Sequence, residues 1–290
     1  MHGPVIDSSN ATAADAFRQA VALHGAGRID ETEAAYRQVL RLDPDHADAW
    51  QLLGVLLARS RRPREGARAM QRSLALNGRQ PGVHANLGNA LFELGEYGEA
   101  LAHFARAIEL VPGLVAAWVN HGGALLGLGR LEEAVQSCSH AMRLAPGQVL
   151  PILHRARALE YLVRFDEALA DYARAIALRP ELAAAQMSRA LLLARCGRYE
   201  EAALQLETLE RRDPWYDGTK GLRLHVQMCI ADWSRWHEDC AAIRGALAAG
   251  HTAAPPLAFL AMSDSGAMQL ECARLYANAN GPPEASSPAA

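Results

Sequence analysis

A fixed period of thirty-four runs through most of the chain and limits the folds that it can adopt. Prolines recur at this interval or at twice this interval, at Pro44, Pro112, Pro146, Pro180 and Pro214. Gly78 stands at the one vacant place in this series. A constant period without insertions indicates one structural unit that is repeated along the chain. We therefore predict six consecutive units, at residues 13–46, 47–80, 81–114, 115–148, 149–182 and 183–216.

Small residues recur at two positions of each unit. The eighth position holds Ala20, Gly54, Gly88, Gly122, Ala156 and Ala190. The twentieth position holds Thr32, Gly66, Ala100, Ala134, Ala168 and Ala202. Two helices approach closely only where side chains are small, so these positions predict a crossing of two helices within each unit. The space beside the crossing is filled from position 24, by Tyr36, Met70, Phe104, Cys138, Tyr172 and Leu206.

Turn and stop signals complete the unit. Glycine at position 15 permits a positive φ at the end of a helix, and it occurs as Gly27, Gly95, Gly129 and Gly197. The recurring proline ends the second helix, because it has no N–H and disfavours helical geometry in the residue before it. Alanine, leucine and arginine dominate the composition and only 6% of residues are aromatic, which favours helices. Each unit is therefore predicted as helix, tight turn, helix.

This pattern resembles the tetratricopeptide repeat over residues 13–216. One hairpin cannot bury its apolar face alone, whereas six stacked hairpins share a continuous core. The resemblance implies an all-α fold, a right-handed superhelical solenoid whose groove is lined by the first helix of each unit. We expect a helical junction or cap at 217–278, a disordered N-terminus at 1–12 and a disordered Pro/Ser/Ala tail at 279–290.

The groove is where we expect a partner to bind, because nothing in the sequence suggests reaction chemistry. Asn86 and Asn120 lie one unit apart, and an amide can both donate to and accept from a peptide backbone. They resemble part of the asparagine ladder in O-linked N-acetylglucosamine transferases; the alternative is that they cap turns or face solvent. The predicted groove residues are Asn86, Asn89, Glu93, Asn120, His154, Arg157, Tyr161 and Ser188.

An arginine cluster at 59–72 suggests another kind of partner. It contains six arginines against one acid, Glu65, and could contact phosphates. The cluster has no interleaved aromatic residues and falls on the turn and second helix, so a solvated face is favoured. With a net charge of −3, whole-chain electrostatics does not favour nucleic acid, although an RNA-binding solenoid stays an alternative.

The segment MCIADWSRWHEDC (228–240) departs from the repeat. His237 and Cys240, with Cys229 upstream, could suggest zinc, but structural zinc takes four ligands in paired clusters and no second pair follows. We predict no metal site and no catalytic residue or cofactor in this chain. Asp232 or Ser234 is the expected N-cap of a second helical segment. The tryptophans at 233 and 236 are expected to pack a helix against the last repeat.

A junction motif sharpens the resemblance. A C-x-D-W-S-x-W-like helix, a P-P-x-x-x-L-x-x-S-D turn and an A-x-Q-L-x-x-A-R-x-Y-A helix look like the segment before the catalytic domain of bacterial, SPINDLY-type relatives of O-linked N-acetylglucosamine transferase. Two residues separate the cysteine from the aspartate here, which departs from that pattern. The matching residues are Cys229, Asp232, Trp233, Ser234, Trp236, Pro255, Pro256, Leu260, Ser263, Asp264, Gln269, Leu270, Ala273, Arg274, Tyr276 and Ala277.

The function suggested by sequence is therefore a protein- or peptide-binding scaffold. The resemblance implies the substrate-recognition part of a protein O-GlcNAc transferase-like glycosyltransferase, with no catalytic domain in this chain. A free-standing adaptor for protein assembly is the alternative, and a homodimer is possible on either interpretation. The start of the chain has no basic and apolar signal pattern, and five scattered cysteines suit a reducing compartment, so we expect a cytoplasmic protein without a membrane partner.

Overall fold

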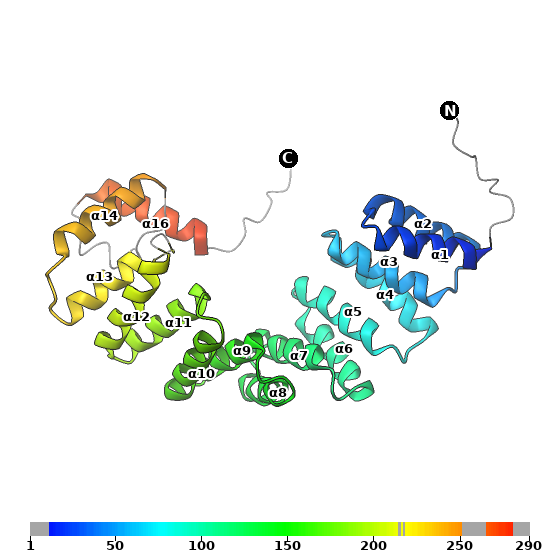
Figure 1. Ribbon diagram of the computed structural model, residues 1–290, viewed down its shortest axis with the longest axis horizontal. Helices are drawn as coiled ribbons and strands as arrows, with labels where there is room; N and C mark the ends of the chain where they lie inside the picture. The colour runs from blue at the N-terminus through cyan, green and yellow to red at the C-terminus, as the bar shows by residue number, and fades with distance from the viewer. Residues whose placement is uncertain (1–11, 214–215, 217, 251–264, 281–290) are drawn as a thin grey trace. The chain divides into compact units, whose positions relative to one another are not determined.

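The computed structural model describes residues 12–213, 216, 218–250 and 265–280. Over these ranges the chain forms fifteen α-helices and no β-strand, and most of them follow one another as short hairpins (Figure 1). The prediction of an all-α fold is confirmed. No helix in these ranges is long and apolar enough to cross a membrane.

The helices between residues 13 and 212 form pairs, and a short turn joins the two helices of each pair. The first helices of the pairs are α1 (Ala13–Gly25), α3 (Ala47–Arg59), α5 (Pro81–Glu93), α7 (Val115–Gly127), α9 (Val149–Tyr161) and α11 (Ala183–Arg195). The second helices are α2 (Ile29–Leu42), α4 (Pro63–Leu76), α6 (Tyr97–Leu110), α8 (Leu131–Leu144), α10 (Phe165–Leu178) and α12 (Tyr199–Arg212). The starts of successive first helices, and those of successive second helices, keep the period of the sequence without exception.

The chain consists of two compact units, at residues 1–158 and 159–290, with the boundary inside α9. We use unit 1 for the described residues up to Ala158 and unit 2 for those from Leu159 onward. In unit 1, α1 contacts α2 and α3 contacts α4, while α2 contacts α3, α4 contacts α5 and α6 contacts α7. Each hairpin therefore buries its apolar face against its neighbours in the sequence.

The turns inside the hairpins use left-handed backbone geometry. The predicted glycines have φ between 71° and 77°, at Gly27, Gly95, Gly129 and Gly197. In the two remaining turns, Arg61 and Val163 stand at the same position with φ of 60° and 61°. Left-handed geometry is unfavourable for a residue with a Cβ atom, and more so for a β-branched one. The turn is thus imposed by the hairpin even where glycine is absent.

The helix crossings are as tight as the small residues predict. A Cβ atom added to Gly88 would lie 2.6 Å from the ring of Phe104, which is fully buried. A Cβ atom on Gly66 would lie 2.6 Å from the backbone oxygen of Gly54, so there the backbones themselves meet. Gly88 and Phe104 confirm the pairing of position 8 with position 24, and Gly54 and Gly66 confirm that positions 8 and 20 meet at a crossing.

A tryptophan joins successive hairpins at the ends of α2 and α6. The helix α2 ends at Leu42, and Asp43 before Pro44 is extended, with φ −139° and ψ 90°. The indole N–H of Trp50 on α3 donates to the carbonyl of Pro44 at 2.8 Å. The same bond recurs two repeats later, from Trp118 to Pro112 at 2.8 Å. The proline follows the end of the helix, and a tryptophan of the next hairpin satisfies its carbonyl group.

The described part of the chain ends with α13 (Thr219–Cys229), α14 (Trp236–Ala248) and α16 (Gly266–Asn280). These helices share a core of Leu224, Cys240, Ile243, Ala246, Leu247 and Cys272, against which Trp236 packs. The expectation that both tryptophans pack against the last repeat is wrong, since Trp233 is 54% exposed and contacts the edge of Trp236. The N-cap prediction is also wrong: Asp232 accepts a hydrogen bond from the backbone N–H of Ser234 at 3.0 Å, and α14 starts at Trp236.

A buried ion-pair network connects α12, α13 and α14 within unit 2. Arg223 on α13 is 2% exposed. Its Nε atom lies 2.8 Å from a carboxylate oxygen of Glu210 on α12, and its guanidinium also pairs with Asp239 on α14, which is 3% exposed. A buried charge is tolerated only when it is paired, so this network fixes how the three helices meet.

Candidate peptide-binding surface

A hollow in unit 1 is formed by three consecutive helices, α3, α4 and α5. Its volume is about 170 Å³. The side chains that line it are Val55, Ala58, Arg59, Met70, Asn86, Asn89, Ala90 and Glu93. Three of the predicted groove residues, Asn86, Asn89 and Glu93, thus come together on one face of α5. The structure places them beside an apolar floor and one arginine.

The amide groups of this surface are arranged differently from the predicted ladder. Asn120 on α7 donates from its Nδ2 to Oδ1 of Asn89 on α5 at 2.7 Å. Asn120 is therefore bonded to Asn89 and not stacked on Asn86. Within the described part of the chain, the Asn86 amide makes no hydrogen bond, so it can still donate and accept.

His154 on α9 packs against α7, the first helix of the preceding pair. Its ring lies 3.0 Å from the place that a Cβ atom on Gly123 would occupy, and its Nδ1 atom is buried without a hydrogen-bond partner. Burial is the main cause that lowers the pKa of His154, while a backbone hydrogen bond to Val119 acts in the opposite direction. These contacts make His154 a packing residue that favours its neutral form.

The other predicted residues are divided between the two units. Arg157 belongs to unit 1 and is exposed, whereas Tyr161 and Ser188 belong to unit 2, where Tyr161 is 59% exposed. In unit 2 the neighbouring charges are satisfied: Arg195 pairs with Glu160, and the Tyr172 hydroxyl donates to Glu160 at 3.2 Å. Arg157, Tyr161 and Ser188 do not line the hollow of α3, α4 and α5, and their part in binding stays a prediction.

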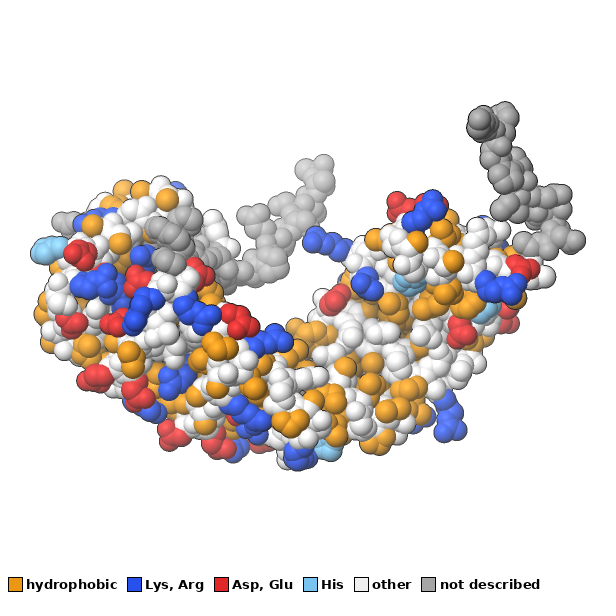
Figure 2. Space-filling model, viewed as in Figure 1, with side chains coloured by type: hydrophobic (Ala, Val, Ile, Leu, Met, Phe, Trp, Pro, Cys, Tyr) orange, Lys and Arg blue, Asp and Glu red, His pale blue; other side chains and the backbone are white. Residues whose placement is uncertain are grey.

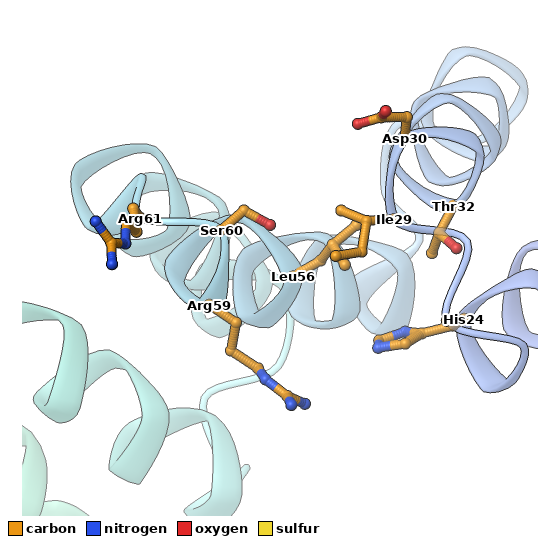
Figure 3. Close-up of a pocket in the computed structure, with 9 residues that line it drawn as sticks. His24, Ile29, Asp30, Thr32, Leu56, Arg59, Ser60 and Arg61 are labelled. Atoms are coloured by element: carbon orange, nitrogen blue, oxygen red, sulfur yellow. The ribbon is translucent and has the colours of Figure 1, made fainter.

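A second, larger hollow lies beside the turns of the first two hairpins in unit 1 (Figure 3). Its volume is about 640 Å³, and its lining is His24, Gly27, Ile29, Asp30, Thr32, Leu56, Arg59, Ser60 and Arg61. Figure 3 shows the side chains of Arg59 and His24 below Leu56, Asp30 on the opposite side, and the Arg61 side chain turned away. Nδ1 of His24 lies 2.9 Å from the Tyr36 hydroxyl, which holds the ring in place.

Arg59 was assigned to a solvated arginine cluster and not to the groove, yet it lines both hollows. It is the last residue of α3, the place that Glu93 has in α5. Because the two residues are one period apart, the choice of Glu93 as a groove residue could also have predicted Arg59. In the part of unit 1 that the structure describes, Arg59 and Glu93 make no ion pair, with each other or with any other residue.

Two of the other five arginines in the cluster, Arg62 and Arg72, are paired with carboxylates. Arg62 pairs with Glu65 at 2.6 Å and with Glu33 at 2.9 Å. Hydrogen bonds to these carboxylates raise the pKa of Arg62. Arg72 pairs with Asp45 at 2.7 Å. These pairs reduce the positive charge that the sequence cluster offers to phosphates.

The repeat hairpin, its crossing glycines and its turn define the class of protein. The family model of the tetratricopeptide repeat matches residues 17–82, 52–115, 85–149 and 153–215, which together cover more than half of the chain. The chain belongs to the tetratricopeptide repeat family. No curated protein matches it.

Several solved structures share this fold. YrrB, described as a tetratricopeptide repeat protein with an unusual peptide-binding site, is 22% identical with a TM-score of 0.58, over 61% of this chain and 91% of YrrB. PilF of Pseudomonas aeruginosa is 21% identical with a TM-score of 0.58, over 70% of this chain and 93% of PilF. A tetratricopeptide repeat protein from Parabacteroides merdae is 15% identical with a TM-score of 0.63, over 91% of this chain and 98% of that protein. At these identities the likeness establishes the fold.

Proposed function

We propose that this chain is a binding scaffold that holds an extended peptide on the first-helix face of unit 1. The observation that carries the proposal is the Asn86 amide, which lines a hollow with an apolar floor and makes no hydrogen bond within the described residues. Since a polar group beside apolar surface gains from a partner, a peptide backbone would satisfy it. YrrB, described as having a peptide-binding site, offers a precedent within the same fold.

The hydrogen bond between Asn120 and Asn89 contributes to the same proposal. Oδ1 of Asn89 accepts from Asn120, so its orientation is fixed and its NH₂ group is left to donate. A side chain that is ordered before binding loses less conformational entropy when the ligand arrives. Asn86 and Asn89 can thus contact a backbone carbonyl and N–H group without reading the side chains of the peptide.

The test is the affinity of a panel of short unrelated peptides, selected on the native chain and measured by fluorescence anisotropy. Asn86→Ala should weaken all of them together, by about 0.5–1.5 kcal/mol each, the net value of one hydrogen bond. Gln71→Ala is the matched control, because Gln71 is an exposed amide on the second helix α4. Unchanged affinities in Asn86→Ala would discard the amide contact.

A narrower role, as the acceptor-recognition part of a glycosyltransferase, is supported by the junction motif alone. Part of that motif, at 255–264, lies outside the described residues. The mass of the native product, detected with an antibody to the repeats, tests this role. A product far larger than this 31.3 kDa chain, with room for a catalytic domain, would support it. A product near 31.3 kDa would favour the free-standing adaptor.

Single-stranded RNA is the remaining alternative, and the pairing of two of the six cluster arginines lowers the positive charge available to it. Arg62 and Arg72 already pair with carboxylates. If phosphate contacts dominated binding, the affinity for an RNA oligonucleotide would fall steeply as salt is raised. We expect no binding that shows such a salt dependence.

A further inference from the structure

We infer that the hollow between α3 and α5 selects its peptide by charge: Glu93 takes a basic side chain, and Arg59 takes an acidic one. This inference rests on the proposed peptide-binding function and names the ligand class of the same site. The two residues line one hollow, carry opposite charges, and make no ion pair within the described residues.

Glu93 stands where its own helix disfavours it. It is the last residue of α5, and no basic residue lies in the last turn of that helix. The carbonyl groups at a helix C-terminus carry a partial negative charge, so a carboxylate there is repelled and a cation is attracted. A lysine or arginine of a bound segment would relieve this repulsion and would gain the attraction of the helix end.

Arg59 is the counterpart on the preceding hairpin. It is the last residue of α3, where the helix end stabilises a cation, and its side chain lines both hollows of unit 1. Arg62, further along the chain, is paired twice with carboxylates, whereas Arg59 has no carboxylate partner in the described chain. Its guanidinium is therefore available to an acidic side chain of a segment that passes from the smaller hollow to the larger one.

The separation of the two charges gives the site its specificity. Both line the smaller hollow, yet no nitrogen of Arg59 lies within ion-pair distance of a Glu93 oxygen. A ligand with charges of both signs can therefore interact with both residues, and a ligand of a single sign is attracted by one and repelled by the other. The apolar floor of Val55, Ala58 and Met70 strengthens these interactions, because charges act more strongly beside low-dielectric surface.

The experiment is selection of short random peptides by phage display on the full chain at low salt, followed by affinity measurements on the selected sequences. The native chain should enrich peptides that contain both a basic and an acidic residue. Glu93→Gln should remove the enrichment of basic residues, and Arg59→Gln that of acidic residues. Replacing one charged residue of a selected peptide by glutamine should weaken binding about two- to fivefold, the usual effect of a partly exposed ion pair.

Matched controls separate the site from the overall charge of the chain. Glu96→Gln and Arg68→Gln make the same chemical changes at exposed positions that do not line the hollow. These variants should keep the enrichment of the native chain. The preference should also weaken as salt is raised, because screening reduces the interaction of exposed charges.

The outcomes distinguish this inference from the function on which it rests. If peptides are selected without charge preference and Asn86→Ala still weakens them, the charge selection is wrong and the peptide groove stands. If the controls lose the preference as fully as Glu93→Gln and Arg59→Gln do, the selection is again wrong. If no peptide is enriched at all, the groove and the charge selection fail together.

Discussion

Two arginines show how differently the two units use charge. Arg223 in unit 2 is almost fully buried and is surrounded by Glu210, Asp239 and Gln227. Arg59 in unit 1 is exposed and has no carboxylate partner in the described chain, although Glu93 lines the same hollow. On the face shown in Figure 2, charged side chains gather over α12 to α14, whereas the surface over α5 and α6 is mostly apolar or uncharged.

The contrast follows from solvation. A guanidinium that leaves water must find carboxylates, so the position of Arg223 dictates the positions of its partners and joins three helices. A guanidinium that stays in water needs none and can remain unpaired at little cost. The charge of Arg223 is thus part of the folded structure of unit 2, whereas the proposed role of Arg59 and Glu93 leaves their charges for a ligand. Four substitutions or conditions would break or sharpen this distinction.

The largest effect is expected from Arg223→Met. The substitution leaves the Asp239 carboxylate buried without its main partner, which costs about 3–5 kcal/mol in comparable buried pairs. Urea unfolding followed by circular dichroism should show an early loss of helical signal. Arg235→Met is the control, because Arg235 is about half exposed and lies 3.9 Å from the same carboxylate. Equal, small losses in both variants would contradict a structural role for the buried network.

A smaller effect should come from the helix crossings. Gly66→Ala places a methyl group against the backbone of Gly54 and Ala58, which cannot move aside, and overpacking of this kind costs about 1–3 kcal/mol. Gly245→Ala on α14 meets no atom within 4 Å, so it should stabilise unit 2 by about 0.5–1 kcal/mol. The free energies of unfolding of the two variants should therefore change in opposite directions. An unchanged or higher free energy of unfolding for Gly66→Ala would show that the crossing tolerates a side chain.

Acid should weaken unit 1 through His84 and His103. Their Nδ1 atoms are 3.0 Å apart. Burial is the main cause that lowers the pKa of each ring below 6.5. For His84, a hydrogen bond to the backbone of Gly78 raises the pKa and the charge of Arg106 lowers it. The unfolded chain then binds more protons than the folded chain just below pH 6.5, so stability should fall as the pH drops through that value. Thermal unfolding should detect this loss, and His103→Gln should reduce it. His225→Gln, at an exposed position of unit 2, should leave it unchanged.

The smallest effect on stability is expected from Arg59→Gln. An exposed residue without a carboxylate partner contributes little to folding, so the free energy of unfolding should change by less than about 0.5 kcal/mol. The same variant is expected to alter peptide selection. If Arg59→Gln destabilises the chain as much as Arg223→Met does, the distinction between committed and available charge is wrong.

The repeat made most of the fold predictable from sequence. The period fixed the helix pairs, the crossing residues and the stop after each second helix, because all of these are local and occur several times. The turns at Arg61 and Val163 were not predictable from local propensity, since neither residue favours φ near 60°. There the helices on both sides decide the geometry.

The sequence predicted which positions of the first helices line the site, but not the hydrogen-bond partners of their side chains. The period brought Asn86, Asn89 and Glu93 onto one face, yet it did not show that Asn120 bonds to Asn89. Side-chain partners depend on rotamers and on the distance between neighbouring helices, which a sequence period does not specify. The segment after the repeats has no period, and its errors at Asp232 and Trp233 reflect that.

Among the described residues of unit 1, the main contacts between helices join neighbouring hairpins, and this has a mechanical consequence. A protein closed by contacts between distant segments resists pulling until it yields at once, whereas a linear stack can release one hairpin at a time. Each released repeat would add roughly 115 Å of extended chain. When unit 1 is pulled from its two ends, we therefore expect its length to increase in steps of similar size, one for each hairpin that unfolds.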